Sequence, residues 1–238
     1  FNKKNTGVAA LKVLKKNGIK VKNSYPGCCG MPQLETGDIS SVAESARTVA
    51  TELCAWADHG YDVIALIPSC ALMLKYEWPL ILPENLDIKR VSEATYDISE
   101  YLLDIANKEG LSDGLGKIDD GVTIHMACHS RAQNMGSKAT ELLRLIPDTN
   151  VDVIERCSGH GGSWGIMKNN FDTALRLGKS TARKAVDSSN KTVVSECPLA
   201  RDHIVQGMEH LSVSGATKKT SPLYHPIEIF AKSCGLGK

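Results

Sequence analysis

The sequence "YPGCCGMPQLETGD" (residues 25–38) sets two adjacent cysteines, Cys28 and Cys29, between glycines and ahead of a proline. Adjacent cysteines are poor disulfide partners, because their Cα atoms lie only about 3.8 Å apart. The neighbouring glycines let the backbone approach closely, so a turn with little side-chain bulk can aim both sulfurs at one site. The pair therefore indicates metal or redox chemistry.

This turn belongs to a unit that occurs twice. The sequence "RCSGHGG" (156–162) follows "GCCGMPQ" (27–33) at an offset of 129, and "SECPLA" (195–200) follows "PSCALM" (68–73) at an offset of 127. Gly136 follows Gly7 at the same offset as the first pair of motifs. Three matches in the same order, at nearly constant spacing, indicate that the chain is a duplication.

Short apolar, β-rich segments alternate with longer segments whose apolar residues have helical spacing. The predicted strands are residues 19–21, 61–68, 121–128, 151–155 and 192–197, and the predicted helices are residues 6–18, 41–60, 137–147 and 171–186. Such alternation favours parallel sheets in an α/β fold. We therefore expect two pseudo-symmetric halves, each a small parallel sheet flanked by helices, at residues 1–106 and 121–238, with a linker at 107–120 that is rich in Gly and Asp.

Most of the cysteines end a predicted strand or lie in the turn after one. The loops at the carboxyl ends of parallel strands gather at one edge of the sheet, where ligands bind. We expect the cysteine loops of the two halves to face each other across the interface, with a first site formed by Cys28, Cys29 and Cys70 and a second formed by Cys128, Cys157 and Cys197, beside which His129 and His160 are further candidate ligands. Helices predicted to begin right after the last cysteine of each site would point amide donors at an anionic cluster. Converging thiolates of this kind suit iron–sulfur clusters or zinc.

The repeat also predicts a cysteine outside the sequence. The offset that relates the two halves places the counterpart of Cys128 just ahead of Phe1. We therefore expect the leading cysteine of the first half to lie upstream of this sequence.

Three other candidates have a structural interpretation. Cys54 lies in a helical pattern and Cys234 lies near the C-terminus, and both are predicted to be core residues, because free cysteine behaves as a small apolar side chain. His125 lies within a predicted strand and is expected to face the core or a neighbouring residue rather than a metal.

The composition excludes several classes of function. The chain has 28 Lys and Arg against 27 Asp and Glu, and a net charge of +1 gives no support for a nucleic-acid-binding surface. No segment approaches the ~20 consecutive apolar residues that a membrane-spanning helix needs. Eight cysteines in a chain too long to be a small disulfide-stapled domain favour thiol or metal chemistry in the cytoplasm.

The motifs "CCGMP", "PSC", "ACHSRAQ", "ERCSGHGGSWG" and "ECPLA" together resemble the cysteine-rich CCG-domain family. Its members include the heterodisulfide reductase B subunit and the C subunit of anaerobic glycerol-3-phosphate dehydrogenase, and the likeness to the latter is greater and includes "HPIEIF" (225–230). The resemblance implies an iron–sulfur oxidoreductase subunit that passes electrons from a flavoprotein dehydrogenase toward quinone or another acceptor. It also implies a ferredoxin-like iron–sulfur segment as a partner, and contact with the inner face of the membrane through a complex.

The sequence departs from the fullest form of the family motif, which ends each half in Cys-Xaa-Xaa-Cys around a noncubane cluster. Ile67 and Val194 stand at the earlier position of each such pair, and Ser158 stands where the first half has Cys29. The ligands for two full noncubane clusters are therefore missing. We expect a 4Fe-4S cluster, cubane or noncubane, or a single zinc or iron ion in the second half. The alternatives to electron transfer are heterodisulfide or thiol–disulfide reduction, and a zinc-bound assembly module with no redox role.

Overall fold

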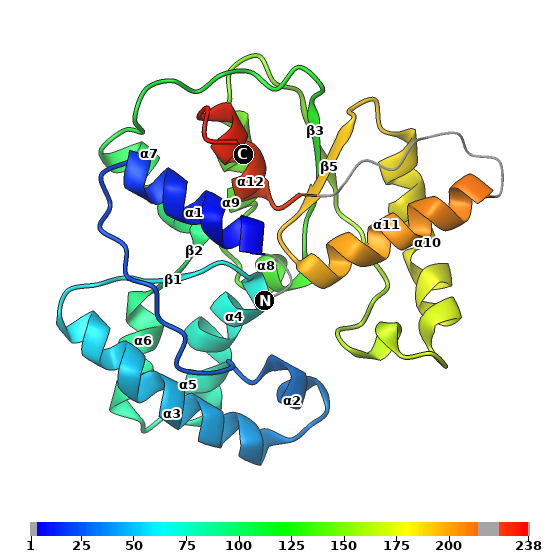
Figure 1. Ribbon diagram of the computed structural model, residues 1–238. Helices are drawn as coiled ribbons and strands as arrows, with labels where there is room; N and C mark the ends of the chain where they lie inside the picture. Colours follow the sequence, from blue (N-terminus) through cyan, green and yellow to red (C-terminus); the bar gives the residue numbers. More distant parts are fainter. Residues whose placement is uncertain (1–3, 214–223, 238) are drawn as a thin grey trace.

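The computed structural model describes residues 4–213 and 224–237 (Figure 1). The helices are α1 (Lys4–Lys16), α2 (Met31–Glu35), α3 (Ile39–Asp58), α4 (Pro68–Leu72), the π-helical η1 (Met73–Glu77), α5 (Trp78–Ile81), α6 (Leu86–Ala94), α7 (Ile98–Lys108), α8 (Cys128–Ala132), α9 (Lys138–Arg144), the 3-10 helix η2 (Trp164–Ile166), α10 (Phe171–Asp187), α11 (Pro198–Val213) and α12 (Pro226–Ser233). The strands are β1 (Val63–Ala65), β2 (Thr95–Asp97), β3 (Val122–His125), β4 (Val151–Ile154) and β5 (Thr192–Ser195). None of these helices is both long and apolar enough to cross a membrane.

The strands form two small parallel sheets, one in each half of the chain. The first sheet pairs β1 with β2, and the second has the order β4-β3-β5. Tyr224 adds a parallel bridge to Val194 at the free edge of β5. Helices flank both sheets (Figure 1), so the predicted α/β fold in two halves is confirmed.

The duplication is visible in the strand register. Ile64 of β1 pairs with Tyr96, and Val194 of β5 bridges to Tyr224 in the same parallel sense. The second pair follows the first at nearly the offset of the sequence repeat. β1 and β2 of the first half therefore correspond to β5 and residue 224 of the second.

Helices from the two halves pack on each other at the interface. The first helix of the first half, α1, packs on α12, the last helix of the second half, and α9 packs reciprocally on α7 (Figure 1). Thr6 at the start of α1 donates its hydroxyl to Glu228 of α12 at 2.7 Å. The largest apolar core lies between these four helices and includes residues of β3 and β5. Each half therefore completes the core of the other.

The structure corrects three of the local predictions. Residues 19–21 are extended but form no strand, because among the described residues they have no ladder partner. Cys70 lies inside α4 rather than ahead of it, since the helix begins at Pro68, a residue favoured in the first turn. The predictions assigned no element between residues 74 and 106, where α5, α6, β2 and α7 complete the first half.

Candidate functional site

The second half brings its three cysteines to one cavity. Cys128 begins α8 after β3, Cys157 lies in the turn after β4, and Cys197 directly precedes α11 after β5. The cavity has a volume of about 360 Å³, and all three cysteines line it together with His129 and His160. Because the carboxyl ends of parallel strands meet at one edge of a sheet, the predicted convergence follows from the fold.

The turn that carries Cys157 is fixed by glycine. Gly159 has φ +88, and a Cβ there would overlap the backbone of Gly178 in α10. The N–H of Gly159 donates to Cys157 Sγ at 3.3 Å, and the hydroxyl of Thr181 donates to the Cys157 carbonyl at 2.6 Å. Only glycine combines this left-handed backbone with such a close helix approach. The turn therefore presents the Cys157 sulfur in a fixed position.

The first half builds its turn in the same way. Gly30, which corresponds to Gly159, has φ +87, and its N–H donates to Cys28 Sγ at 3.5 Å. Cys29 is buried, and its thiol donates to Cys70 Sγ at 3.4 Å. The indole N–H of Trp78 holds the Cys29 carbonyl at 2.9 Å. The three first-site cysteines thus come from the turn ahead of α2 and from α4.

Burial and hydrogen bonding set the protonation of the thiols. Burial raises the pKa of Cys128 and of Cys197, so both stay protonated unless a cation is near. In the first site the shared hydrogen bond raises the pKa of Cys29 and lowers that of Cys70. Cys70 is therefore the sulfur of this pair that ionises first. Because a metal ligand must be a thiolate, metal binding at either site would release protons.

The two histidines beside the second site are neutral. Burial lowers the pKa of His129 and of His160 below the usual value. His160 Nε2 lies 3.9 Å from Cys197 Sγ, and its Nδ1 lies 3.3 Å from the Gly162 carbonyl. A neutral imidazole can coordinate a metal or hydrogen-bond a sulfur, so both roles are open to His160.

The two cysteine loops meet across the interface between the halves. Glu35, at the end of α2, accepts the backbone N–H of Ser163 at 3.2 Å. A Cβ on Gly162 would overlap the Glu35 carboxylate, which shows how closely the loops approach. Gln133 Nε2 donates to the Pro68 carbonyl at 3.4 Å, which ties the end of α8 to the start of α4. The predicted placement of the cysteine loops at this interface is confirmed.

The three residues predicted to be structural have core surroundings or protein partners. Cys54 packs in the core around α3, and Cys234 packs in the core between the halves. His125 borders the cavity, but its Nδ1 lies 3.0 Å from Ser195 Oγ and its Nε2 lies 2.9 Å from the Arg156 carbonyl. Both ring nitrogens of His125 therefore have protein partners, as a core histidine requires.

Sequence reasoning missed four polar residues around the cysteines, namely Glu35, Gln133, Glu196 and His203. Glu196 precedes Cys197, is fully enclosed and accepts the Ser130 hydroxyl at 2.5 Å. Burial and the nearby Asp97 raise the pKa of Glu196 to about 8. Within the described ranges, neither ring nitrogen of the buried His203 has a hydrogen-bond partner. The position of Glu196 beside a cysteine was the one available signal, while the others come together only through long-range packing.

Cys128, Cys157 and Cys197 all line the same cavity. Across residues 4–213 and 224–237, no three His, Cys, Asp or Glu side chains already stand where one metal ion could bind all of them. A single tetrahedral ion needs every sulfur about 2.3 Å from a common centre. A cluster of several irons takes each thiolate on a different iron, so its sulfurs are spread around it.

Comparison with known proteins matches the two cysteine-bearing regions. The model of the cysteine-rich domain, CCG, matches residues 1–75 and 122–199. An uncharacterized iron-sulfur protein of Methanocaldococcus jannaschii is 28% identical over 240 residues, which cover 98% of this chain and 44% of the relative. The C subunit of the anaerobic glycerol-3-phosphate dehydrogenase of Escherichia coli K12 is 28% identical over 200 residues, 83% of this chain and 50% of the relative.

A third relative is the D subunit of the dihydromethanophenazine:CoB–CoM heterodisulfide reductase of Methanosarcina acetivorans. It is 27% identical over 221 residues, which cover 85% of this chain and 50% of the relative. The chain spans about half the length of these curated relatives.

Proposed function

Because the chain belongs to the cysteine-rich domain (CCG) family, we propose that it is the iron–sulfur, electron-transfer part of a multi-subunit oxidoreductase. The observation that carries the proposal is the cavity at the carboxyl ends of β3, β4 and β5, which three cysteines from three different strands line together. One relative is named an iron–sulfur protein. Two others are named as a subunit of a dehydrogenase and a subunit of a reductase.

Cys128, Cys157 and Cys197 would hold the cluster of the second half, with neutral His160 as a fourth ligand or a hydrogen-bond donor to sulfur. A bound iron–sulfur cluster supplies one-electron redox chemistry. The N–H groups of Gly159 and Ala200 already donate to the Cys157 and Cys197 sulfurs, at 3.3 and 3.5 Å. Such donors stabilise negative charge on sulfur, and they are one of the means by which a protein sets the reduction potential.

We propose a 4Fe-4S cluster for the second half rather than a single zinc or iron ion. The volume of the cavity, about 360 Å³, and its lining by three cysteines support this choice. Cys28, Cys29 and Cys70 are proposed ligands of a second cluster, for which the repeat predicts a further cysteine upstream of Phe1.

The proposed partner is a flavoprotein dehydrogenase subunit, which would pass electrons through this chain and a ferredoxin-like iron–sulfur segment toward quinone or another acceptor. A candidate docking surface is the segment that follows Cys157, where Trp164, Ile166 and Met167 of η2 and its C-cap are exposed, between 43% and 61%. Trp164 begins η2, shortly after Cys157 in the chain. Exposed apolar side chains gathered beside a redox site favour a protein interface. We further propose a cytoplasmic location, with the membrane reached only through partner subunits.

A second candidate function rests on the pair Cys29 and Cys70. Their sulfurs are 3.4 Å apart, close enough for a small movement to form a disulfide. Thiol–disulfide reduction at this pair is therefore the alternative to electron transfer through a cluster.

The test is the metal and sulfide content of anaerobically purified protein. Electron transfer through a 4Fe-4S cluster requires iron and acid-labile sulfide in equal amounts, and such a protein absorbs broadly in the visible range. Stoichiometric zinc in a colourless protein would instead indicate the assembly module. Metal-free protein that still reduces disulfides, and stops doing so in Cys70→Ser, would support the second candidate.

A further inference from the structure

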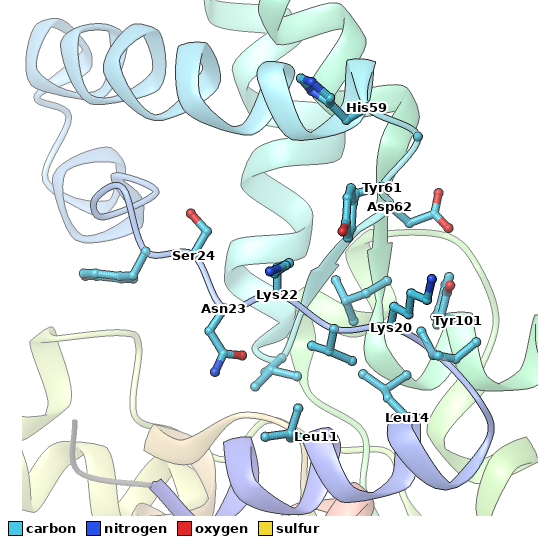
Figure 2. Close-up of a pocket in the computed structure, with 16 residues that line it drawn as sticks. Leu11, Leu14, Lys20, Lys22, Asn23, Ser24, His59, Tyr61, Asp62 and Tyr101 are labelled. Atoms are coloured by element: carbon cyan, nitrogen blue, oxygen red, sulfur yellow. The ribbon is translucent and has the colours of Figure 1, made fainter.

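A second, larger cavity lies at the edge of the first sheet. Its volume is about 620 Å³. The extended segment 19–25 forms one wall, and residues 61–66, which include β1, form the other. Leu11 and Leu14 of α1 close one side (Figure 2). Figure 2 shows Lys20, Lys22, Asn23 and Ser24 along the extended segment, with Tyr61 and Asp62 at the start of the opposite wall.

The second half has a strand at the corresponding place. The offset between the cysteine turns makes segment 22–25 the counterpart of β4, and β1 is the counterpart of β5. In the second half β3 lies between β4 and β5, pairs with both, and is buried along its whole length. The same offset puts the counterpart of β3 ahead of Phe1. The cavity therefore has the two walls of a three-stranded sheet and lacks the middle strand.

We infer that this cavity is the docking site of a central β-strand, and that the strand is supplied by polypeptide that precedes Phe1 in the chain. It would pair in parallel with β1 on one side and with segment 19–25 on the other. The first half would then have the order 22–25, new strand, β1, β2, which matches β4, β3, β5 and residue 224 of the second half.

The direction of the chain agrees with this position. A strand parallel to β1 ends at the carboxyl end of β1, so the helix that follows must begin there. Gly7, in the first turn of α1, faces Leu66 just after β1, and a Cβ on Gly7 would lie 3.9 Å from Leu66 Cδ1. The order strand, α1, segment 19–25 then repeats the order β3, α9, β4, in which the short helix α8 lies between β3 and α9.

Within the described residues, the two walls do not pair with each other across the cavity. Only β2 pairs with β1, and within the described part of the chain no backbone hydrogen bond joins segment 19–25 to β1. Ile19, Val21, Ile64 and Leu66 pack against the core between the halves but remain partly exposed. Open strand edges with apolar side chains are sites for strand addition. The occupant would be a short run of apolar, β-branched residues like those of β3.

The end of such a strand would lie at the carboxyl edge of the sheet, where Cys28, Cys29 and Cys70 are found. The cysteine expected upstream of Phe1 would therefore arrive at the first site by the path that brings Cys128 to the second. The docking site itself does not depend on any cluster, because it is defined by the walls.

The test is to add a copy of β3 to the chain as the proposed central strand. Residues 121–129, with Cys128→Ser in the copy so that no metal ligand is introduced, are fused directly ahead of Phe1 of the full chain. The matched control carries the same extension with Thr123→Pro and His125→Pro in the copy, which removes two amide donors from the strand. Hydrogen exchange is measured by mass spectrometry in residues 20–25 and 62–66, with α10 as the internal reference.

We expect the copied strand to slow exchange in both walls by about tenfold or more, while α10 is unchanged and the proline control has no effect. No slowing, slowing in one wall alone, or equal slowing by the proline control would overturn the inference. If the extended chain is insoluble, the same segment is added as a capped peptide, and absence of protection in both walls at millimolar peptide overturns the inference. Protection of the unextended chain that rises with protein concentration would assign the site to a second copy, and would also overturn it.

Discussion

Glu100 and Glu228 occupy equivalent positions in the two halves, and each carboxylate closes a capping box at the start of the last helix of its half. Each carboxylate also forms an ion pair with a basic side chain that comes shortly after a candidate cysteine ligand in the chain. Glu100 binds Lys75, after Cys70, at 2.7 Å, and Glu228 binds Arg201, after Cys197, at 3.4 Å. The duplicated fold thus ties each cysteine-bearing segment to a helix that packs on the other half.

Glu228→Ala should destabilise the interface between the halves. The change removes the Glu228 half of the capping box of α12, the acceptor of the Thr6 hydroxyl and the counter-ion of Arg201, whose side chain is 4% exposed. Loss of a cap and of a buried charge partner should lower the free energy of unfolding by about 2–4 kcal/mol. Chemical denaturation measures this change, and Glu209→Ala, at an exposed helical position, should change it by less than about 0.5 kcal/mol. Equal effects of the two variants would contradict the structural role of Glu228.

Cys157→Ala should remove the cluster of the second half while the protein stays folded. The lost thiolate would expose iron to solvent and oxygen, so iron, sulfide and visible absorbance should fall in anaerobic preparations. Cys54→Ala is the matched control, since Cys54 packs in a core away from the cavity. That variant should keep its iron and lose only about 1 kcal/mol of stability. Full metal content in Cys157→Ala would show that the second half retains its cysteines for structure alone.

Gly159→Ala should distort the Cys157 turn. The new Cβ would overlap backbone atoms of α10 at a φ of +88, so the turn or the helix must move. We expect a loss of more than about 3 kcal/mol in stability, together with weaker metal binding at the second site.

Gly37→Ala is the control for that change. Gly37 has φ +80 with no atom within 4 Å of an added Cβ, so it tests the backbone strain alone. It should cost about 1 kcal/mol and leave metal content unchanged. If the two alanine variants lose equal stability, the close approach of α10 is unimportant.

Glu196→Gln should make metal-free protein more stable at alkaline pH. Burial and then Asp97 raise the pKa of the folded-state Glu196 to about 8, above its ordinary value of 4.5. The protonated form is favoured on folding, so this contribution to stability is complete below pH 4.5 and is lost as pH rises through 8. Glutamine stays neutral, so the variant should match wild type at acid pH and should be more stable than wild type above pH 8.

Thermal unfolding from acid to alkaline pH measures the difference, with Glu84→Gln, at an exposed residue, as the control. Parallel pH profiles of Glu196→Gln and wild type would show that Glu196 is ionised in the folded protein.

Trp164→Ala should weaken docking of the proposed flavoprotein partner. The side chain is 43% exposed beside the second site, so its removal should leave the fold and the metal content intact. An aromatic anchor at the centre of an interface is worth about 2 kcal/mol or more. The apparent affinity for the partner should then fall at least about tenfold, and titration of electron transfer against partner concentration measures it. Leu80→Ala, at a residue 77% exposed and outside that surface, is the control, and unchanged affinity in Trp164→Ala would remove the docking surface.

The candidate cysteines could be predicted because their signal is local. Cys28, Cys157 and Cys197 each follow an apolar segment or lie in a glycine turn. Each of these motifs also occurs in both halves of the repeat. Glu35 and His203 gave no such signal. Glu35 approaches the second site only because α2 lies against the turn at Gly162, a contact between residues more than a hundred positions apart.

Residues 19–21 show why the strand prediction failed in one place. Their composition favours a strand, but a strand is assigned only where a neighbour supplies hydrogen bonds, and β1 stands on the far side of a cavity from them. Propensity is a property of the segment, whereas pairing is a property of the sheet.

Periodicity and repeated motifs, which are local features of the chain, predict the duplication, the α/β class and the six candidate cysteines. Tertiary packing alone places α1 on α12 and α9 on α7, encloses Glu196 beside Cys197, and leaves a cavity between β1 and segment 19–25. These features depend on which apolar faces meet across the interface. Such contacts join residues far apart in sequence, and no local pattern encodes them.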